Sequence, residues 1–300
     1  MGDSMMLPLV LATAFAAPVK MTPMEAGATV RLLFRQRRAA QRWLAQDRAS
    51  YLATIGRYDF GTKRTLAVGS APDEDVRLEG RGLRPHHLEV TVAGEEFEVQ
   101  AVDSKATFLF HNAPMRTAKM TSGSLRVGRF TLRLSNQNYP AILVQDPKSP
   151  RFEDYKGLQF FPIDFAYRYI LPLTPNPKPE TVVILSTRGD RRKALRVGWF
   201  DFLVHGERCR LEVDRLLEPG LGESDLSVFF RDQTTGHESY PVGRYVDPEK
   251  LSNGEYLLDF NLAYNPACAY SPYYNCPIPP RANRLRVAIR AGEMDAHYRH

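Results

Sequence analysis

The chain has 300 residues, of which 43% are hydrophobic and 25% charged, a composition typical of a globular protein. At about 100–200 residues per domain, this length predicts two domains. The formal net charge is +6, but the basic residues are mostly interleaved with acidic ones, so the charge pattern argues against a nucleic-acid partner.

Residues 1–23 allow two interpretations. They form either a signal or disordered segment, or a short segment that is buried. The run LPLVLATAFA has the length of a signal-peptide core, and Ala14-Phe15-Ala16 fits an A-x-A cleavage site. However, the preceding residues include Asp3 and neither Lys nor Arg. The run is too short to span a bilayer. Cleavage would place the protein in the periplasm or outside the cell, and without cleavage it stays in the cytoplasm.

Residues 24–48 have the periodicity of an amphipathic helix. The apolar residues that recur at helical spacing are Leu32, Leu33, Ala40, Trp43 and Leu44. Four arginines lie mostly off that face: Arg31, Arg35, Arg38 and Arg42. The pattern favours a helix that packs on a domain with its arginines in solvent. The alternative is a basic helix on a membrane surface, so any membrane contact is expected only through this N-terminal segment.

Residues 50–145 consist mainly of short β-rich runs separated by Gly, Asp and Asn, and residues 90–100 predict a hairpin. The order of VGSAPDEDVRLEG, LRPHHLEVTV, FEVQAVDSKATFLFHNAPM and GSLRVGRFTLRL resembles a forkhead-associated (FHA) β-sandwich. Members of that family bind phosphothreonine. The resemblance implies that residues 50–145 adopt the β-sandwich fold of the family.

The phosphate-binding residues of the FHA family are only partly present. Ser70 follows Gly69 where the family has its phosphate-binding arginine, and Leu83 replaces the serine of the second motif. Arg84 and His87 match the end of that motif, and Asn112 is followed by Ala113 instead of the glycine. Phosphate recognition needs converging charged donors. We therefore expect a scaffold that does not bind phosphopeptides, with His87 packed and hydrogen-bonded.

Residues 146–295 predict an antiparallel β domain. The sequence around His205-Gly206 predicts a hairpin, residues 169–187 two strands joined by a proline-rich turn, and RLRVAIRAGE (284–293) a closing strand. The stretches YKGLQFFPIDFAYR, FFRDQTTGHESYPVGRY and LDFNLAYNPACAYSPYYNCPIPPRANRL resemble the DUF1684 family over residues 152–293. This resemblance implies positions of interest but no activity. The overall expectation is a mostly β protein with an N-terminal helix.

The polar residues of this domain predict one cluster. Arg231 and Arg244 are expected to face Asp232 and Asp259 around a cavity, where arginine forks could bind a carboxylate or a phosphate. The alternative is a buried ion-pair network that fixes the loops. The candidate ligand-binding residues are Arg231, Arg244, Tyr245, Asn261, Tyr264 and Asn265.

Catalysis has weaker support in the sequence. The candidate catalytic residues are Asp232, His237 and Asp259, but Glu238 adjoins His237 and adjacent strand residues point to opposite faces. Common hydrolase and nucleotide-binding motifs are absent from the sequence. We therefore expect a non-catalytic binding protein without a cofactor, for a small molecule, a sugar or a peptide. A hydrolase-like enzyme is the alternative.

The chain has three cysteines. Cys268 and Cys276 are eight positions apart in a stretch rich in Tyr and Pro, a spacing unusual for zinc, and no metal site is predicted. A disulfide between them would stabilise the fold by roughly 2–3 kcal/mol and would require an oxidising compartment. Two free buried thiols and a metal site remain the alternatives. Cys209 fits a small core residue.

Overall fold

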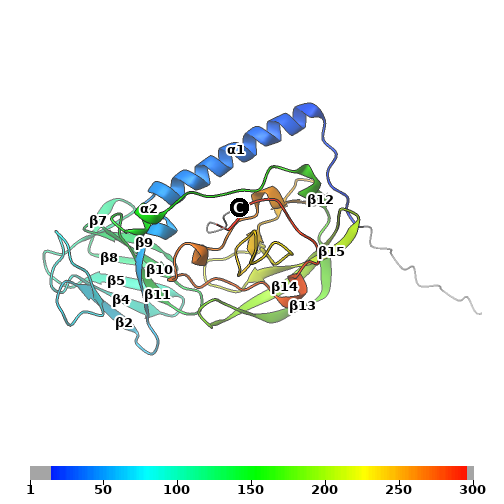
Figure 1. Ribbon diagram of the computed structural model, residues 1–300. Helices are drawn as coiled ribbons and strands as arrows, with labels where there is room; N and C mark the ends of the chain where they lie inside the picture. The colour runs from blue at the N-terminus through cyan, green and yellow to red at the C-terminus, as the bar shows by residue number, and fades with distance from the viewer. Residues whose placement is uncertain (1–14, 296–300) are drawn as a thin grey trace, which may run out of the picture.

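The computed structural model describes residues 15–295, and it is mostly β, as expected from the sequence (Figure 1). A sandwich of short strands is followed by a second β unit with longer strands, and one long helix lies across both (Figure 1). The predicted signal segment lies largely outside the described residues. Ala16, at the end of the predicted cleavage site, donates its N–H to the carbonyl of Asp201 in the second unit.

Helix α1 (Pro23–Gln46) begins at a capping box. Thr22 Oγ1 accepts the N–H of Glu25 at 3.3 Å, and the Glu25 carboxylate accepts the N–H of Thr22 at 2.8 Å. The helix ends where Asp47 donates its N–H to the carbonyl of Trp43. No helix among the described residues is long and apolar enough to cross a membrane.

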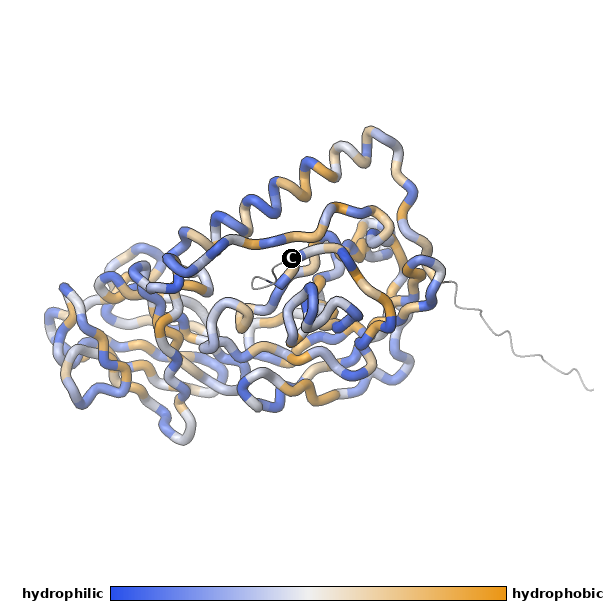
Figure 2. Tube along the Cα trace, in the orientation of Figure 1, coloured by the Kyte–Doolittle hydropathy of each residue, from blue (hydrophilic) through white to orange (hydrophobic). Residues whose placement is uncertain are grey.

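The inner face of α1 differs from the predicted one. Leu33 and Leu44 are buried, whereas Leu32 is 45% and Trp43 37% exposed. Hydrophilic and hydrophobic residues alternate along the helix in Figure 2. Arg37 lies toward the body of the protein, where its Nη1 donates to the carbonyl of Phe161 at 3.0 Å. The helix therefore packs through a narrow stripe that includes the stem of an arginine.

The first β unit is an FHA-like sandwich. Within the described residues it comprises two sheets, ordered β1-β11-β10-β9-β6-β7 and β3-β2-β4-β5-β8. The strands are β1 (Thr54–Asp59), β2 (Thr65–Gly69), β3 (Val76–Arg77), β4 (Leu88–Ala93), β5 (Glu96–Ala101), β6 (Phe108–Phe110), β7 (Ala113–Met115), β8 (Thr117–Met120), β9 (Gly123–Val127), β10 (Phe130–Ser135) and β11 (Ala141–Gln145). The predicted hairpin is confirmed as the antiparallel pair β4–β5.

The residues of the FHA-like motif hold loops of the sandwich. His87 is 2% exposed, and its Nδ1 accepts the N–H of Arg84 while Nε2 lies 3.0 Å from the carbonyl of Thr107. The expectation of a packed histidine is confirmed, and burial lowers its pKa. Asn112 has φ +63° in the turn between β6 and β7, a backbone conformation that Asn tolerates.

The second unit contains longer strands. They are β12 (Arg168–Leu171), β13 (Thr174–Leu185), β14 (Arg191–Val204), β15 (Glu207–Leu216), β16 (Val228–Phe230), β17 (Arg244–Val246), β18 (Glu249–Lys250) and β19 (Tyr256–Asp259). The hairpin β14–β15 confirms the prediction, since both turn residues, His205 and Gly206, have positive φ, as a tight two-residue turn requires. A short helix, α2 (Arg151–Asp154), lies between the two units.

Two predictions for this unit are wrong. The proline-rich stretch at 175–179 is not a turn but part of β13, which tolerates proline because it pairs only with β14 and has a register shift there. The segment 284–293 is not a strand. Side chains satisfy its backbone instead: Arg244 binds the carbonyl of Ile289, and Asp232 accepts the N–H of the same residue.

Strand β11 joins the two units, because both of its faces are buried. Ile142 and Val144 pack in the sandwich core, while Ala141 and Leu143 point into a cluster with residues of the second unit. That cluster also contains Ile184, Ala194, Phe229, Tyr245, Tyr274 and Cys276. The near-continuous apolar sequence of β11 is what a strand buried on both faces requires.

Candidate functional site

Arg244 lies at the centre of a buried network in the second unit. Its side chain has no exposed surface and lies between the rings of Phe161 and Phe230. Its guanidinium donates to the carbonyls of Ile289 at 2.7 Å and Ala291 at 2.5 Å. Burial lowers the pKa of this arginine, and the nearby Asp232 carboxylate opposes the shift.

The partner carboxylate of Arg244 is equally enclosed. Asp232 lies 3.4 Å from Arg244 Nη2 and accepts hydrogen bonds from the N–H of Ile289 at 2.6 Å and the hydroxyl of Thr234 at 2.9 Å. Both charged groups are thus used to fix the chain around residue 289. This arrangement fits the interpretation of these residues as a buried ion-pair network better than the interpretation that they surround a ligand cavity.

The structure does not bring the other two members of the predicted quartet to this pair. Arg231 donates its Nε to the carbonyl of Val242 at 2.8 Å. Asp259 pairs with Arg168, which stands directly opposite it on strand β12. The predicted quartet is therefore wrong as a single cluster, because Arg231 and Asp232 are neighbours in an extended chain and Asp259 belongs to another sheet.

The remaining polar candidates divide between loop-holding and surface positions. Asn261 binds both the N–H and the carbonyl of Asp164, and Asn265 donates its amide to the carbonyl of Met294. His237 lies exposed in a turn. The three candidate catalytic side chains therefore do not form one constellation: Asp232 is paired with Arg244, Asp259 with Arg168, and His237 faces solvent.

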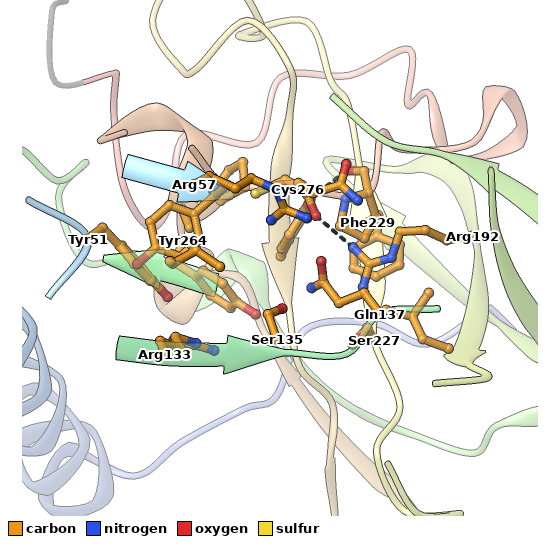
Figure 3. Close-up of a pocket in the computed structure, with 18 residues that line it drawn as sticks. Tyr51, Arg57, Arg133, Ser135, Gln137, Arg192, Ser227, Phe229, Tyr264 and Cys276 are labelled. Atoms are coloured by element: carbon orange, nitrogen blue, oxygen red, sulfur yellow. Dashed lines mark hydrogen bonds between the residues drawn. The ribbon is translucent and has the colours of Figure 1, made fainter. Parts of the chain in front are cut away.

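Two of the predicted ligand-binding residues, Tyr245 and Tyr264, line a pocket of about 240 Å³ between the two units (Figure 3). Tyr245 follows Arg244 on β17 and therefore points to the opposite side of the strand. The other lining residues are Tyr51, Arg57, Arg133, Ser135, Gln137, Leu143, Arg192, Leu216, Ser227, Phe229, Pro266, Ala267, Tyr274, Asn275, Cys276 and Pro277.

The pocket lining has an unusual charge balance, since it contains three arginines and neither aspartate nor glutamate. Arg192 is paired with Glu218 at 2.5 Å. Arg57 donates its Nε–H to Asp59, but its Nη2 is buried and has no hydrogen-bonding partner among residues 15–295. In Figure 3 the polar ends of Arg57, Arg192 and Gln137 point toward the middle of the pocket.

Asn275 is a second buried polar group in the pocket. It is 3% exposed, and within the part of the chain that the structure describes neither its amide nitrogen nor its amide oxygen has a hydrogen-bonding partner, although its backbone carbonyl accepts from Arg192. Burial raises the pKa of Tyr51 to about 12 and also raises that of Tyr264, so these side chains are neutral hydroxyls at pH 7. The pocket therefore offers cationic and neutral polar groups beside aromatic rings.

Sequence reasoning missed the arginines of this pocket. They come from three strands distant in sequence: Arg57 from β1, Arg133 from β10 and Arg192 from β14. Arg57 and Arg133 are isolated basic residues in their strands, whereas Arg192 lies in the basic run Arg191-Arg192-Lys193. Strands commonly carry such residues on their solvent side. The available signal was the alternation in β10, which places Arg133 on the face opposite the sandwich core.

Among residues 15–295, no group of three or more His, Cys, Asp or Glu side chains is placed to hold a metal ion. All three cysteines are free thiols in the structure, including the pair proposed as a disulfide. Cys209 is 5% exposed in the core of the second unit, as a small core residue should be.

The second unit matches a known protein family. Residues 153–294 match the family described as "Protein of unknown function (DUF1684)". The chain belongs to this family. The DUF1684 region contains the Arg244 network, both cysteines of the Tyr/Pro-rich loop and one wall of the pocket.

Several solved structures are similar to parts of this chain. An uncharacterized protein of Haloarcula marismortui, determined by NMR, is 41% identical over 47% of this chain and 78% of its own, with a TM-score of 0.38. An FHA domain studied for phosphothreonine-dependent interactions is 22% identical over 27% of this chain and 75% of its own, with a TM-score of 0.21. The FhaA FHA domain, solved in complex with the intracellular domain of another protein, is 20% identical over 29% of this chain and 96% of its own, with a TM-score of 0.21. No curated protein matches the chain.

Proposed function

We propose that this protein is a non-catalytic binding protein whose ligand is a small organic anion held in the pocket between the FHA-like sandwich and the DUF1684 unit. The observation that carries the proposal is the buried Nη2 of Arg57, which finds no partner among the described residues, in a pocket whose described lining includes three arginines and no acid. Leaving a buried donor unpaired costs about 1–3 kcal/mol. A carboxylate or phosphate would supply the missing acceptor.

The walls of the pocket favour a ligand that also has an apolar or planar part. Tyr51, Phe229, Tyr245, Tyr264 and Tyr274 all contribute to the lining. Aromatic walls bury planar groups well, and a few polar side chains then fix their orientation. The pocket of about 240 Å³ is smaller than a typical drug-sized site, which favours a small molecule over a sugar polymer or a long peptide.

The hydrolase-like alternative has less support. It requires Asp232, His237 and Asp259 to act together on one substrate, but these side chains belong to three different environments. The substrate would also need access to Arg244, which has no exposed surface. Binding in the pocket needs no such rearrangement.

Isothermal titration calorimetry tests the proposal with phenyl phosphate and benzoate as anionic probes and benzamide as the neutral probe. We expect an anionic probe to bind and Arg57→Ala to weaken its binding about 10-fold or more, because a charged hydrogen bond contributes about 1.5–3 kcal/mol. Arg64→Ala is the matched control, since Arg64 is exposed and does not line the pocket. Equal affinities for Arg57→Ala and Arg64→Ala, or no binding of either anion, would contradict the proposal.

A further inference from the structure

The two cysteines of the DUF1684 unit lie close together in a rigid loop. Cys268 is part of a 3-10 turn (Ala267–Ala269), and its backbone N–H donates to the sulfur of Cys276 at 3.3 Å. Cys276 is anchored to the neighbouring loop, because its N–H donates to Thr187 Oγ1 at 3.1 Å and its carbonyl accepts the N–H of Thr187 at 2.9 Å. The backbone thus holds one sulfur beside the other residue's backbone.

The surroundings of the two sulfurs differ. The hydroxyl of Tyr240 lies 3.8 Å from the sulfur of Cys268 and donates to the carbonyl of the same residue at 3.1 Å. A hydrogen bond from the thiol of Cys276 lowers the pKa of Cys268 to about 7, while the same interaction raises that of Cys276. Cys268 is therefore the thiol of the pair that ionises more readily. Because the thiolate is the nucleophile in thiol–disulfide exchange, Cys268 is suited to be the attacking sulfur.

The two cysteines differ in their exposure to solvent. Cys268 is partly exposed, and Cys276 lines the pocket described above. Cys209 offers the contrast: it is 5% exposed in an apolar core, and burial raises its pKa to about 11. A pair of core thiols with only a packing role would need neither a hydroxyl beside one sulfur nor a place on a pocket wall.

We propose that Cys268 and Cys276 form a redox-active dithiol that exchanges with small organic disulfides. The Cys268 thiolate attacks one sulfur of the small disulfide, forming a mixed disulfide and releasing one small thiolate, which takes up a proton. Cys276 then loses its proton and attacks the sulfur of Cys268, which forms the internal disulfide and releases the second small thiol. The protein loses two electrons and two protons, and the small disulfide gains both.

This inference goes beyond the proposed ligand binding and does not depend on it, because its readout is the state of the sulfurs. The folded, reduced protein is equilibrated in buffers of glutathione and glutathione disulfide, quenched with acid and alkylated, and its peptides are weighed. We expect a reversible product two hydrogens lighter, with Cys268 linked to Cys276. Absence of this linkage at every ratio of the two glutathione forms overturns the proposal.

Single variants separate the roles of the two thiols. Cys276→Ser removes the second attack, so it should accumulate glutathione on Cys268, while Cys268→Ser should accumulate none on Cys276. Cys209→Ser is the matched control and should form the internal disulfide as the unaltered protein does. Glutathione that adds equally to Cys276 in Cys268→Ser would contradict the assignment of Cys268 as the attacking thiol.

A measurement on the unaltered protein covers the case in which a variant does not fold. The rate of alkylation of Cys268 by iodoacetamide should rise through a midpoint near pH 7, following its thiolate fraction. Cys209 should stay unlabelled over the same period. Equal labelling of Cys268 and Cys209 at every pH would show that Cys268 is an ordinary buried thiol and would overturn the proposal.

Discussion

At the scale of single residues, Arg244 shows how a side chain suited to ligand binding can serve the fold. Its guanidinium binds backbone carbonyls of the 289–293 segment and the carboxylate of Asp232, and it has no exposed surface. A buried ion pair contributes little net stability, but removing one partner leaves the other charge uncompensated. Arg244 therefore determines where the C-terminal segment lies.

Arg244→Met should lower the free energy of unfolding by about 3–5 kcal/mol, because Asp232 and three carbonyls lose their partner. Urea denaturation measures this loss. Arg231→Met is the matched control: Arg231 is partly exposed and makes one hydrogen bond to a carbonyl, so its loss should cost about 1 kcal/mol. Adding Asp232→Asn to Arg244→Met should recover part of the stability, because the uncompensated charge is removed. Equal losses for the two arginine variants would show that the network is not structural.

At the scale of elements, helix α1 illustrates how narrow a packing stripe can be. The helix spans Pro23–Gln46, but only Leu33 and Leu44 are fully buried. Phe34 is 51% exposed on the outer side of the helix. The position of α1 therefore depends on a few contacts, supplemented by Arg37 and by Gln41, which accepts the N–H of Leu158 at 2.7 Å.

Leu33→Ala should destabilise the protein by about 2–5 kcal/mol, since it empties a fully buried position. Leu32→Ala removes the same atoms from the adjacent residue, which is 45% exposed, and should change stability by at most about 0.5 kcal/mol. The denaturant midpoints of both variants, compared at constant slope, give the result. If Leu32→Ala proved as costly as Leu33→Ala, the helix would pack through a different face.

At the scale of the whole molecule, the FHA-like sandwich and the DUF1684 unit share a core. Ala141 and Leu143 of β11 pack with apolar residues of the second unit. Polar contacts surround this cluster: the hydroxyls of Thr54 and Tyr274 lie 2.8 Å apart, and the amide of Asn138 donates to the carbonyl of Leu217. Two units joined through a common buried cluster should unfold together.

Differential scanning calorimetry should therefore show one transition whose calorimetric and van't Hoff enthalpies agree. Tyr274→Phe removes the buried hydroxyl contact with Thr54, so it should cost about 1 kcal/mol and lower the midpoint by about 2–4 °C without splitting the transition. Tyr273→Phe is the control, since the neighbouring Tyr273 is partly exposed, whereas Tyr274 is buried. Two separate transitions in the unaltered protein would mean that the units are energetically independent.

The sequence alone determined the local structure and the families that the two units resemble. Period-two alternation and Gly turns identified the hairpins β4–β5 and β14–β15, because both signals act between residues close in the chain. The prediction from sequence failed for the 284–293 segment. Its pattern is that of a strand, but Arg244 and Asp232 bind its backbone groups at Ile289 in place of a neighbouring strand. Local propensity cannot reveal that a distant side chain takes the place of a strand.

Only the tertiary structure decided which polar residues meet. Residues 231–265 contain many polar side chains, but pairing across strands separates Asp259 from Arg244, and alternation along β17 turns Tyr245 away from Arg244 toward the pocket. The pocket arginines come from three distant strands, so no local motif contains them. The physical reason is that a site is defined by the distance between side chains in space, which sheet register and the packing of two units set together.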